Sequence, residues 1–196
     1  LEYGEQVRYY LEELVKISPK IKGVRRIAQD YPDPMYYAQP KMIDGHRVLA
    51  EFGLSSDLTG KAHQIPGMIE LARQVPECNF ILDHHGNPNV KDHEWEPWAK
   101  NITELAKLPN VVSKISGIVS NADPDNWTLD DIKPYVRHCL ESFGEDRVIF
   151  GSDWPVVTLA ASYQRWVDAL DAITIDFSDA AKLKLWNTNA KRFYRL

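Results

Sequence analysis

The chain has 196 residues, of which 44% are hydrophobic and 11% aromatic, enough to bury a hydrophobic core. Its formal net charge of -5, with no long block of Lys and Arg, argues against a protein that binds nucleic acid or a membrane surface. No run approaches the roughly 20 apolar residues that a bilayer-spanning helix needs. We therefore expect a cytoplasmic protein whose partner is a small molecule.

The two cysteines support the same location. Cys78 and Cys139 lie far apart and have neither a Cys-x-x-Cys nor a zinc-finger spacing. We expect two reduced thiols, as in a cytosolic protein, rather than a disulfide.

Apolar residues at helical spacing begin within the first ten positions. They predict a helix over residues 5–17, followed by a short strand over 21–27. A second helical segment ends at Phe52-Gly53, where the glycine suits a helix C-terminus, and a strand follows over 54–59. Helix and strand therefore alternate from the start.

The alternation continues along the rest of the chain. The later strands are expected over 78–85 and 110–118 and from 147 onward. The later helices are expected over 66–75, 95–109, up to about 143, over 163–173, and from the N-cap candidate Ser178 to Phe193. Five strands, each followed by a helix, predict an α/β fold with a buried parallel sheet.

Polar residues stand at the carboxyl end of every predicted strand, which is where parallel α/β proteins gather their chemistry. In strand order these ends carry Arg25, Asp57, His84, Lys114 and Asp153. A solvated strand end would also be polar, so each residue alone has an ordinary explanation. Their recurrence at the same end of every strand favours a functional site.

Two of these residues indicate the type of chemistry. A histidine such as His84 can bind a metal or accept a proton, and a carboxylate such as Asp153 can position and deprotonate water. Side chains alternate along a strand, so we expect His84 to share a face with Phe80 and Leu82 and to enter the site. His85 should then point to the other face, as a structural histidine hydrogen-bonded to a helix.

The cations Arg25 and Lys114 could hold a substrate carboxylate or polarise a carbonyl. Alternatively, each forms a salt bridge at its strand end. No Gly-x-Gly-x-x-Gly or Walker-type loop is present, and "GSDWP" is not the Gly-x-Ser-x-Gly elbow of a serine hydrolase. Nucleotide binding and serine hydrolysis are therefore disfavoured.

Five motifs, in order and at matching separations, resemble those of the amidohydrolase-2 family of TIM-barrel hydrolases, which includes sugar-acid lactonases: "KGVRRI", "FILDHHGNP", "NVVSKISGI", "FGEDRVIFGSDWPV" and "NAKRFYRL". The resemblance implies a (β/α)8 barrel in which these strands are numbers four to eight. Residues 1–196 would then be the C-terminal part of a single barrel domain. The family's strand-six histidine matches His84, and its strand-eight aspartate matches Asp153.

Together, the resemblance and the residues imply hydrolytic opening of a lactone. Asp153 would be the general base on an attacking water, and His84 would orient that water directly or through a divalent metal. Arg25 and Lys114 would stabilise the oxyanion or grip a carboxylate. Zinc is a hypothesis only, because His84 and Asp153 alone are too few ligands for a firm site.

Two further residues have two interpretations each. Asp57 either contacts substrate hydroxyls or caps a loop. Trp154 either forms a wall of the substrate pocket or packs beneath a loop.

The sequence departs from the family in one respect. The family's first strand carries a His-x-His or similar motif, and nothing of that type precedes Leu1. We expect strands one to three, about 80 to 100 residues, to be missing. A five-stranded arc would expose two sheet edges, so we expect the missing segment or another copy of the chain to cover them.

Two alternative functions remain open. The first is a metal-dependent decarboxylase of the same superfamily. The second is a catalytically inactive barrel fragment that acts as a structural or interaction module.

Overall fold

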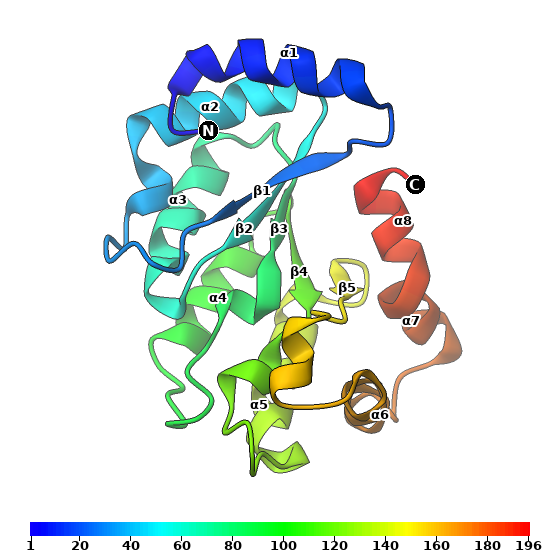
Figure 1. Cartoon of the computed structure of the whole chain (residues 1–196). Coiled ribbons are helices and arrows are strands. Elements are labelled where there is room, and N and C mark those ends of the chain that lie inside the picture. The colour runs from blue at the N-terminus through cyan, green and yellow to red at the C-terminus, as the bar shows by residue number, and fades with distance from the viewer.

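The computed structural model describes residues 1–196 and contains one sheet of five parallel strands paired in chain order (Figure 1). The strands are β1 Gly23–Ile27, β2 Ser55–Thr59, β3 Phe80–Leu82, β4 Val111–Ile115 and β5 Val148–Phe150. The predicted alternation of parallel strands and helices is confirmed. The outer strands β1 and β5 each pair on one side only, so the sheet is open.

The longer helices form a layer over one face of this sheet. Consecutive helices pack against one another from the first to the sixth, so the layer follows the strand order. They are α1 Val7–Ile17, α2 Pro40–Glu51, α3 Ile65–Gln74, α4 Trp98–Ala106, α5 Leu129–Phe143 and α6 Tyr163–Ile173. No helix is both long enough and apolar enough to cross a membrane.

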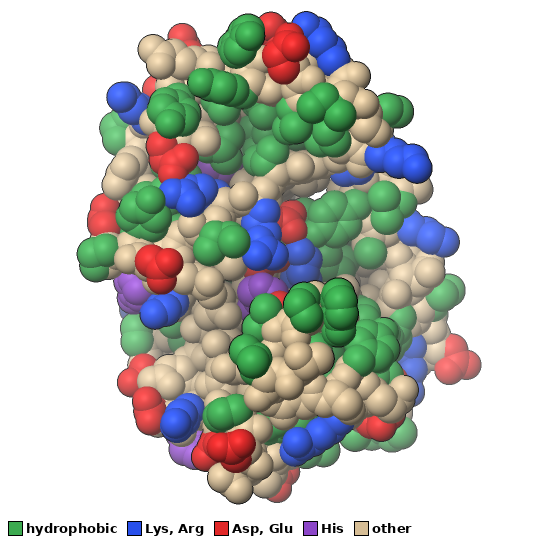
Figure 2. Space-filling model, viewed as in Figure 1, with side chains coloured by type: hydrophobic (Ala, Val, Ile, Leu, Met, Phe, Trp, Pro, Cys, Tyr) green, Lys and Arg blue, Asp and Glu red, His purple; other side chains and the backbone are tan.

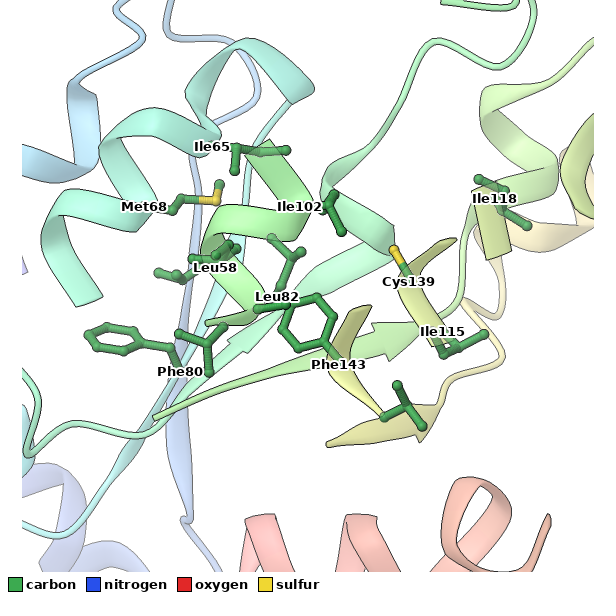
Figure 3. Close-up of a cluster of buried hydrophobic side chains, with 14 of the residues drawn as sticks. Leu58, Ile65, Met68, Phe80, Leu82, Ile102, Ile115, Ile118, Cys139 and Phe143 are labelled. Atoms are coloured by element: carbon green, nitrogen blue, oxygen red, sulfur yellow. The ribbon is translucent and has the colours of Figure 1, made fainter. Parts of the chain in front are cut away.

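The main hydrophobic core lies between the sheet and this helix layer (Figure 3). Alternate strand residues point into it, among them Phe80 and Leu82 of β3 and Ile115 of β4, all fully buried. Met68 of α3 and Phe143 of α5 meet them from the helix side. Every second strand residue therefore packs against the helices. The residues between them lie on the opposite face of the sheet.

The opposite face of the sheet carries a small second core. Ile81, Val112 and Ile149 come from the three strands β3 to β5, and each is about 1% exposed. Helix α8 (Asn189–Tyr194) packs over them with Ala190, Phe193 and Tyr194. In Figure 1 this red helix lies across the sheet from the α1 to α5 layer. The C-terminal segment thus covers the face that the other helices leave open.

The last predicted helix, Ser178 to Phe193, is interrupted. Ser178 is an N-cap as predicted, because its hydroxyl accepts a hydrogen bond from the backbone N–H of Ala181. Helix α7 covers only Asp179–Leu183, and a π-helical turn at Lys184–Thr188 separates it from α8. The residues after this turn, Phe193 and Tyr194 among them, are those that pack on the sheet.

The strands β3 and β5 end earlier than the sequence predicts, at Leu82 and Phe150. The residues that follow leave the extended conformation, since His84, His85 and Asp153 have positive φ angles of 54°, 56° and 56°. Side-chain alternation therefore does not apply to His84, and the prediction that it shares a face with Phe80 and Leu82 is wrong. Those two residues point into the helix-covered core, whereas His84 turns to the carboxyl end of the sheet.

The buried His46 of α2 gives a prediction for acid stability. Its Nδ1–H donates to the Met42 carbonyl, its Nε2 accepts from the Ser56 hydroxyl, and burial lowers its pKa from 6.5 to about 4. The folded state therefore resists protonation of His46, and the free energy of unfolding falls as the pH drops from 6.5 to about 4. We expect His46 to contribute up to ~1.4 kcal/mol per pH unit to this fall.

Urea unfolding across that pH range, compared between the wild type and His46→Gln, measures this contribution. We expect the pH dependence to be shallower in His46→Gln, because the titrating ring is gone. Equal slopes in the two proteins would contradict the assignment.

Candidate active site

The carboxyl ends of the strands bring together five of the six residues singled out in the sequence. Figure 2 shows cationic, acidic and histidine side chains gathered in a hollow near the centre of the viewed face. The contacts join them in two connected groups, one around Lys114 and one around His84.

Lys114 of β4 lies between two carboxylates from neighbouring strands. Its Nζ is 2.6 Å from Oδ2 of Asp57 and 2.6 Å from Oδ1 of Asp83. Asp83 is fully buried, and its Oδ2 accepts a 2.5 Å hydrogen bond from the Thr59 hydroxyl. One ammonium group thus pairs with two carboxylates, carried by β2 and by the end of β3.

These charges influence one another strongly because they are buried. Burial alone would lower the pKa of Lys114, but the carboxylates of Asp83 and Asp57 outweigh it and raise that pKa above its ordinary value. Burial raises the pKa of Asp57, and the positive charge of Lys114 opposes this rise. The sequence alternative of a strand-end salt bridge is therefore the arrangement that Lys114 adopts.

The second group pairs His84 with Asp153. Nε2 of His84 lies 3.7 Å from Oδ1 of Asp153, and its Nδ1 lies 2.9 Å from the hydroxyl of Ser116, just after β4. Burial lowers the pKa of His84 and raises the pKa of Asp153. A neutral imidazole therefore faces a carboxylate that is a stronger base than an exposed aspartate.

The left-handed backbone at His84 and Asp153 is what aims the two side chains at each other. Non-glycine residues with such φ angles are uncommon and costly, and in folded proteins they concentrate at functional sites. Gly117 makes room for the ring, since a Cβ at this position would lie 2.6 Å from Nδ1 of His84. The geometry of the pair thus depends on three special backbone conformations, because Gly117 also has a positive φ of 66°.

The two remaining predicted residues lie at the rim. The Arg25 side chain is 48% exposed, and its Nη1 is 3.9 Å from Oδ2 of Asp83. Trp154 is 69% exposed, with its backbone N–H bound to the Ser152 hydroxyl. Arg25 therefore borders the charged cluster with a guanidinium group open to solvent, whereas Trp154 is not packed beneath a loop.

His85 is excluded from the site, as predicted, but its partner differs. It is fully buried, and its Nδ1–H donates to the Ser116 carbonyl 3.1 Å away rather than to a helix. Burial lowers the pKa of His85 to about 3, so the ring stays neutral.

Asp83, Ser116 and Tyr194 also belong to the site and are not among the residues predicted for it. The Tyr194 hydroxyl of α8 donates a 2.9 Å hydrogen bond to Oδ2 of Asp57, and its ring centroid is 5.6 Å from Nζ of Lys114. Asp83 and Ser116 stand at predicted strand ends and could have been selected on that signal. Tyr194 carries no such signal, because it reaches the site only through the packing of α8 over the small second core.

The chain's own residues do not complete a metal centre. No group of three or more His, Cys, Asp or Glu side chains is arranged to hold a metal ion. His84 and Asp153 offer two donors where zinc sites in proteins use three or four protein ligands.

Comparison with known proteins places this architecture. The protein is 31% identical over 183 residues to an L-fucono-1,5-lactonase of Burkholderia ambifaria, across 91% of this chain and 63% of that protein. It is 35% identical over 194 residues to an L-fucono-1,5-lactonase of Burkholderia multivorans, across 90% of this chain and 64% of that protein. The chain thus spans less than two thirds of the length of these relatives.

A crystal structure of an amidohydrolase from Burkholderia multivorans with bound zinc superposes with a TM-score of 0.89 and 30% identity, over 95% of this chain and 69% of that one. This match confirms the predicted fold class, with the five strands forming roughly the latter half of an amidohydrolase TIM barrel. The family described as Amidohydrolase matches residues 5–196. Since that match takes in nearly the whole sequence, the chain belongs to the amidohydrolase family.

Proposed function

We propose that the complete protein hydrolyses a lactone of a sugar acid or a related carboxylic acid, and that residues 1–196 are the C-terminal part of its single barrel domain. The observation that carries the proposal is the mostly buried His84–Asp153 pair, with side chains 11% and 14% exposed, beside the exposed guanidinium group of Arg25 at the carboxyl ends of the strands. The L-fucono-1,5-lactonases among its relatives support the same chemistry.

In this proposal Asp153 takes a proton from water while the water oxygen attacks the lactone carbonyl carbon. The negative charge that develops on the carbonyl oxygen faces His84 and Arg25. The ring C–O bond then breaks, and the leaving alkoxide receives the proton that Asp153 accepted. The product is the open-chain hydroxy acid, and Asp153 returns to its starting state.

The two cations take different roles in this mechanism. Lys114 is bound at 2.6 Å to both Asp57 and Asp83, so its charge is already compensated. Arg25, which is 48% exposed and only 3.9 Å from one carboxylate oxygen, is free to grip a substrate carboxylate or oxyanion. Asp57 and the exposed ring of Trp154 are proposed as contacts to substrate hydroxyls and to the sugar ring.

A divalent metal is part of the proposal for the complete protein, and the zinc-bound relative supports it. His84 and Asp153 would be its ligands from this chain, and zinc would polarise the lactone carbonyl. The remaining ligands would have to come from other residues. The hydrolytic steps described above therefore involve no metal ion.

The alternatives are less well supported. A metal-dependent decarboxylase would share the barrel, but two of the relatives above 30% identity are named lactonases and none is named a decarboxylase. An inactive structural module would not need an imidazole and a carboxylate placed 3.7 Å apart by costly backbone conformations. A panel of sugar lactones and hydroxybenzoates, assayed with the complete protein, separates all three functions.

The location and the partners follow from the same proposal. Cys78 and Cys139 are buried and unbonded to each other, which suits the reducing cytoplasm. The net charge of -5 favours a small-molecule substrate over nucleic acid or an anionic membrane. The free edges of β1 and β5 would be covered by the segment that precedes this chain or by a second copy.

Asp153→Asn tests the catalytic assignment. We expect kcat for sugar-lactone opening by the complete protein to fall by roughly 10²- to 10⁴-fold, because the amide cannot accept the proton from water. Asp171→Asn, on the exposed side of α6, is the matched control and should leave kcat unchanged. Unchanged hydrolysis by Asp153→Asn would refute the role of Asp153 as the base.

Arg25→Met and Lys114→Met test the division between the two cations. We expect Lys114→Met to lower the free energy of unfolding by about 3–5 kcal/mol, because it leaves Asp57 and Asp83 buried without a counter-charge. Arg25→Met should unfold like the wild type in urea and lose kcat/KM for lactones.

Replacing Asp57 and Asp83 by neutral residues provides the control for Lys114→Met. Asp57→Asn with Asp83→Asn in the Lys114→Met background should recover part of the lost stability. A Lys114→Met protein as stable as the wild type would contradict the proposed compensation.

The open edges predict how the 196-residue chain behaves when expressed alone. We expect it to self-associate, because the unpaired backbone groups of β1 and β5 offer templates for strand pairing. Sedimentation velocity over a range of concentrations measures this. A stable monomer at every concentration would show that the edges need no cover.

A further inference from the structure

The hydroxyl of Ser116 has a single hydrogen-bond partner, Nδ1 of His84, at 2.9 Å. Ser116 is 1% exposed, so its hydroxyl is screened from bulk water. Its carbonyl is occupied separately by Nδ1–H of the neighbouring His85. The direction of the Ser116–His84 hydrogen bond therefore decides whether the serine proton has an acceptor at all.

Only one direction satisfies both groups. If Nδ1 of His84 carried the ring proton, the serine oxygen would accept it, and the buried serine O–H would have no acceptor. If the serine donates instead, Nδ1 accepts through its lone pair, and every polar atom of the contact is paired. The proton of the imidazole then belongs on Nε2, the nitrogen 3.7 Å from Oδ1 of Asp153.

We propose that Ser116 is a positioning residue, whose hydroxyl donates to Nδ1 of His84 and thereby holds the ring proton on Nε2, directed at Asp153. Gly117 supports this arrangement, because its missing side chain lets the backbone after Ser116 pack against the ring. The end of β4 thus fixes both the orientation and the tautomer of a histidine carried by the turn after β3.

This tautomer makes His84 a hydrogen-bond donor toward the reacting atoms. Its Nε2–H can stabilise the oxygen of a lactone carbonyl as negative charge develops there. Coordination of a metal through Nε2 would require the opposite arrangement, in which the proton moves to Nδ1 and Ser116 becomes the acceptor. The catalytic role rests on the proposed function, whereas the position of the proton does not.

Long-range proton–nitrogen NMR correlation on the ¹⁵N-labelled, metal-free complete protein reads the tautomer directly, at a pH above the range in which histidine titrates. His84→Gln identifies the His84 signals by their loss. We expect the wild-type spectrum to show an unprotonated Nδ1 and a protonated Nε2. In Ser116→Ala the two nitrogen shifts should move toward each other, because nothing then fixes the proton.

Ser113→Ala is the matched control. Ser113 is also a buried serine, in the middle of β4, but its side chain lies against the Cys139 thiol on the helix-covered face. We expect the His84 spectrum of Ser113→Ala to match the wild type. A proton on Nδ1 in the wild type, unchanged His84 shifts in Ser116→Ala, or equal changes in the two variants would each overturn the proposal.

Kinetics provide the second measurement. In the complete protein we expect Ser116→Ala to lower kcat for lactone hydrolysis by on the order of 10- to 100-fold, as second-layer partners of functional histidines do. KM should stay within about twofold, since Ser116 does not contact the substrate. Wild-type kcat in Ser116→Ala would overturn the positioning role, whereas an inactive wild type would refute the proposed function and leave the NMR result standing.

Discussion

The ion pairs of Lys114 with Asp57 and Asp83 are the constraint on which the rest of the site depends. They form a charged level of the sheet that joins three strands: Asp83 and Lys114 come two residues after Ile81 and Val112, and Asp57 is in register with Ile81. A buried charge without a partner is costly, so this level is stable only when both signs are present and in contact. The chain therefore changes from an apolar layer to a charged layer within two residues along β4.

The charged layer positions the reactive pair as well as the strands. Asp83 is held by Lys114 and Thr59, and the backbone turns left-handed at the next residue, His84. The backbone also turns left-handed at Asp153, after β5. The imidazole of His84 and the carboxylate of Asp153 therefore approach from β3 and β5, which are not adjacent in the sheet. The local strain at these turns is offset by the ordered network that surrounds them.

Much of this architecture follows from local sequence patterns. The alternation of apolar segments and the polar strand ends are physical signals within a few residues, and they predict the parallel sheet and the gathering of Arg25, Asp57, His84, Lys114 and Asp153. The conformations after the strands are different, because no pattern indicates that His84 and Asp153, neither of them glycine, adopt positive φ angles. Side-chain alternation holds only as far as Leu82, where β3 ends. For this reason the prediction that His84 shares a face with Phe80 and Leu82 is wrong.

Contacts between residues distant in the chain were also beyond prediction from local pattern. The donor–acceptor relation of Ser116 and His84 requires the turn after β3 to meet the end of β4. The contact of Tyr194 with Asp57 requires α8 to pack over the small second core. Such contacts depend on tertiary packing, which outweighs the local preferences of the residues involved.

The position of α8 has a consequence for how this protein can change over evolutionary time. Tyr194 and Asp57 are 137 positions apart, yet they share a hydrogen bond above the small second core. A substitution at either position removes the hydrogen bond that the Asp57 carboxylate receives beside Lys114, so its effect depends on which residue occupies the other. Helix α8 and strand β2 should therefore diverge together, as one coupled unit, rather than as a surface helix beside an independent catalytic sheet.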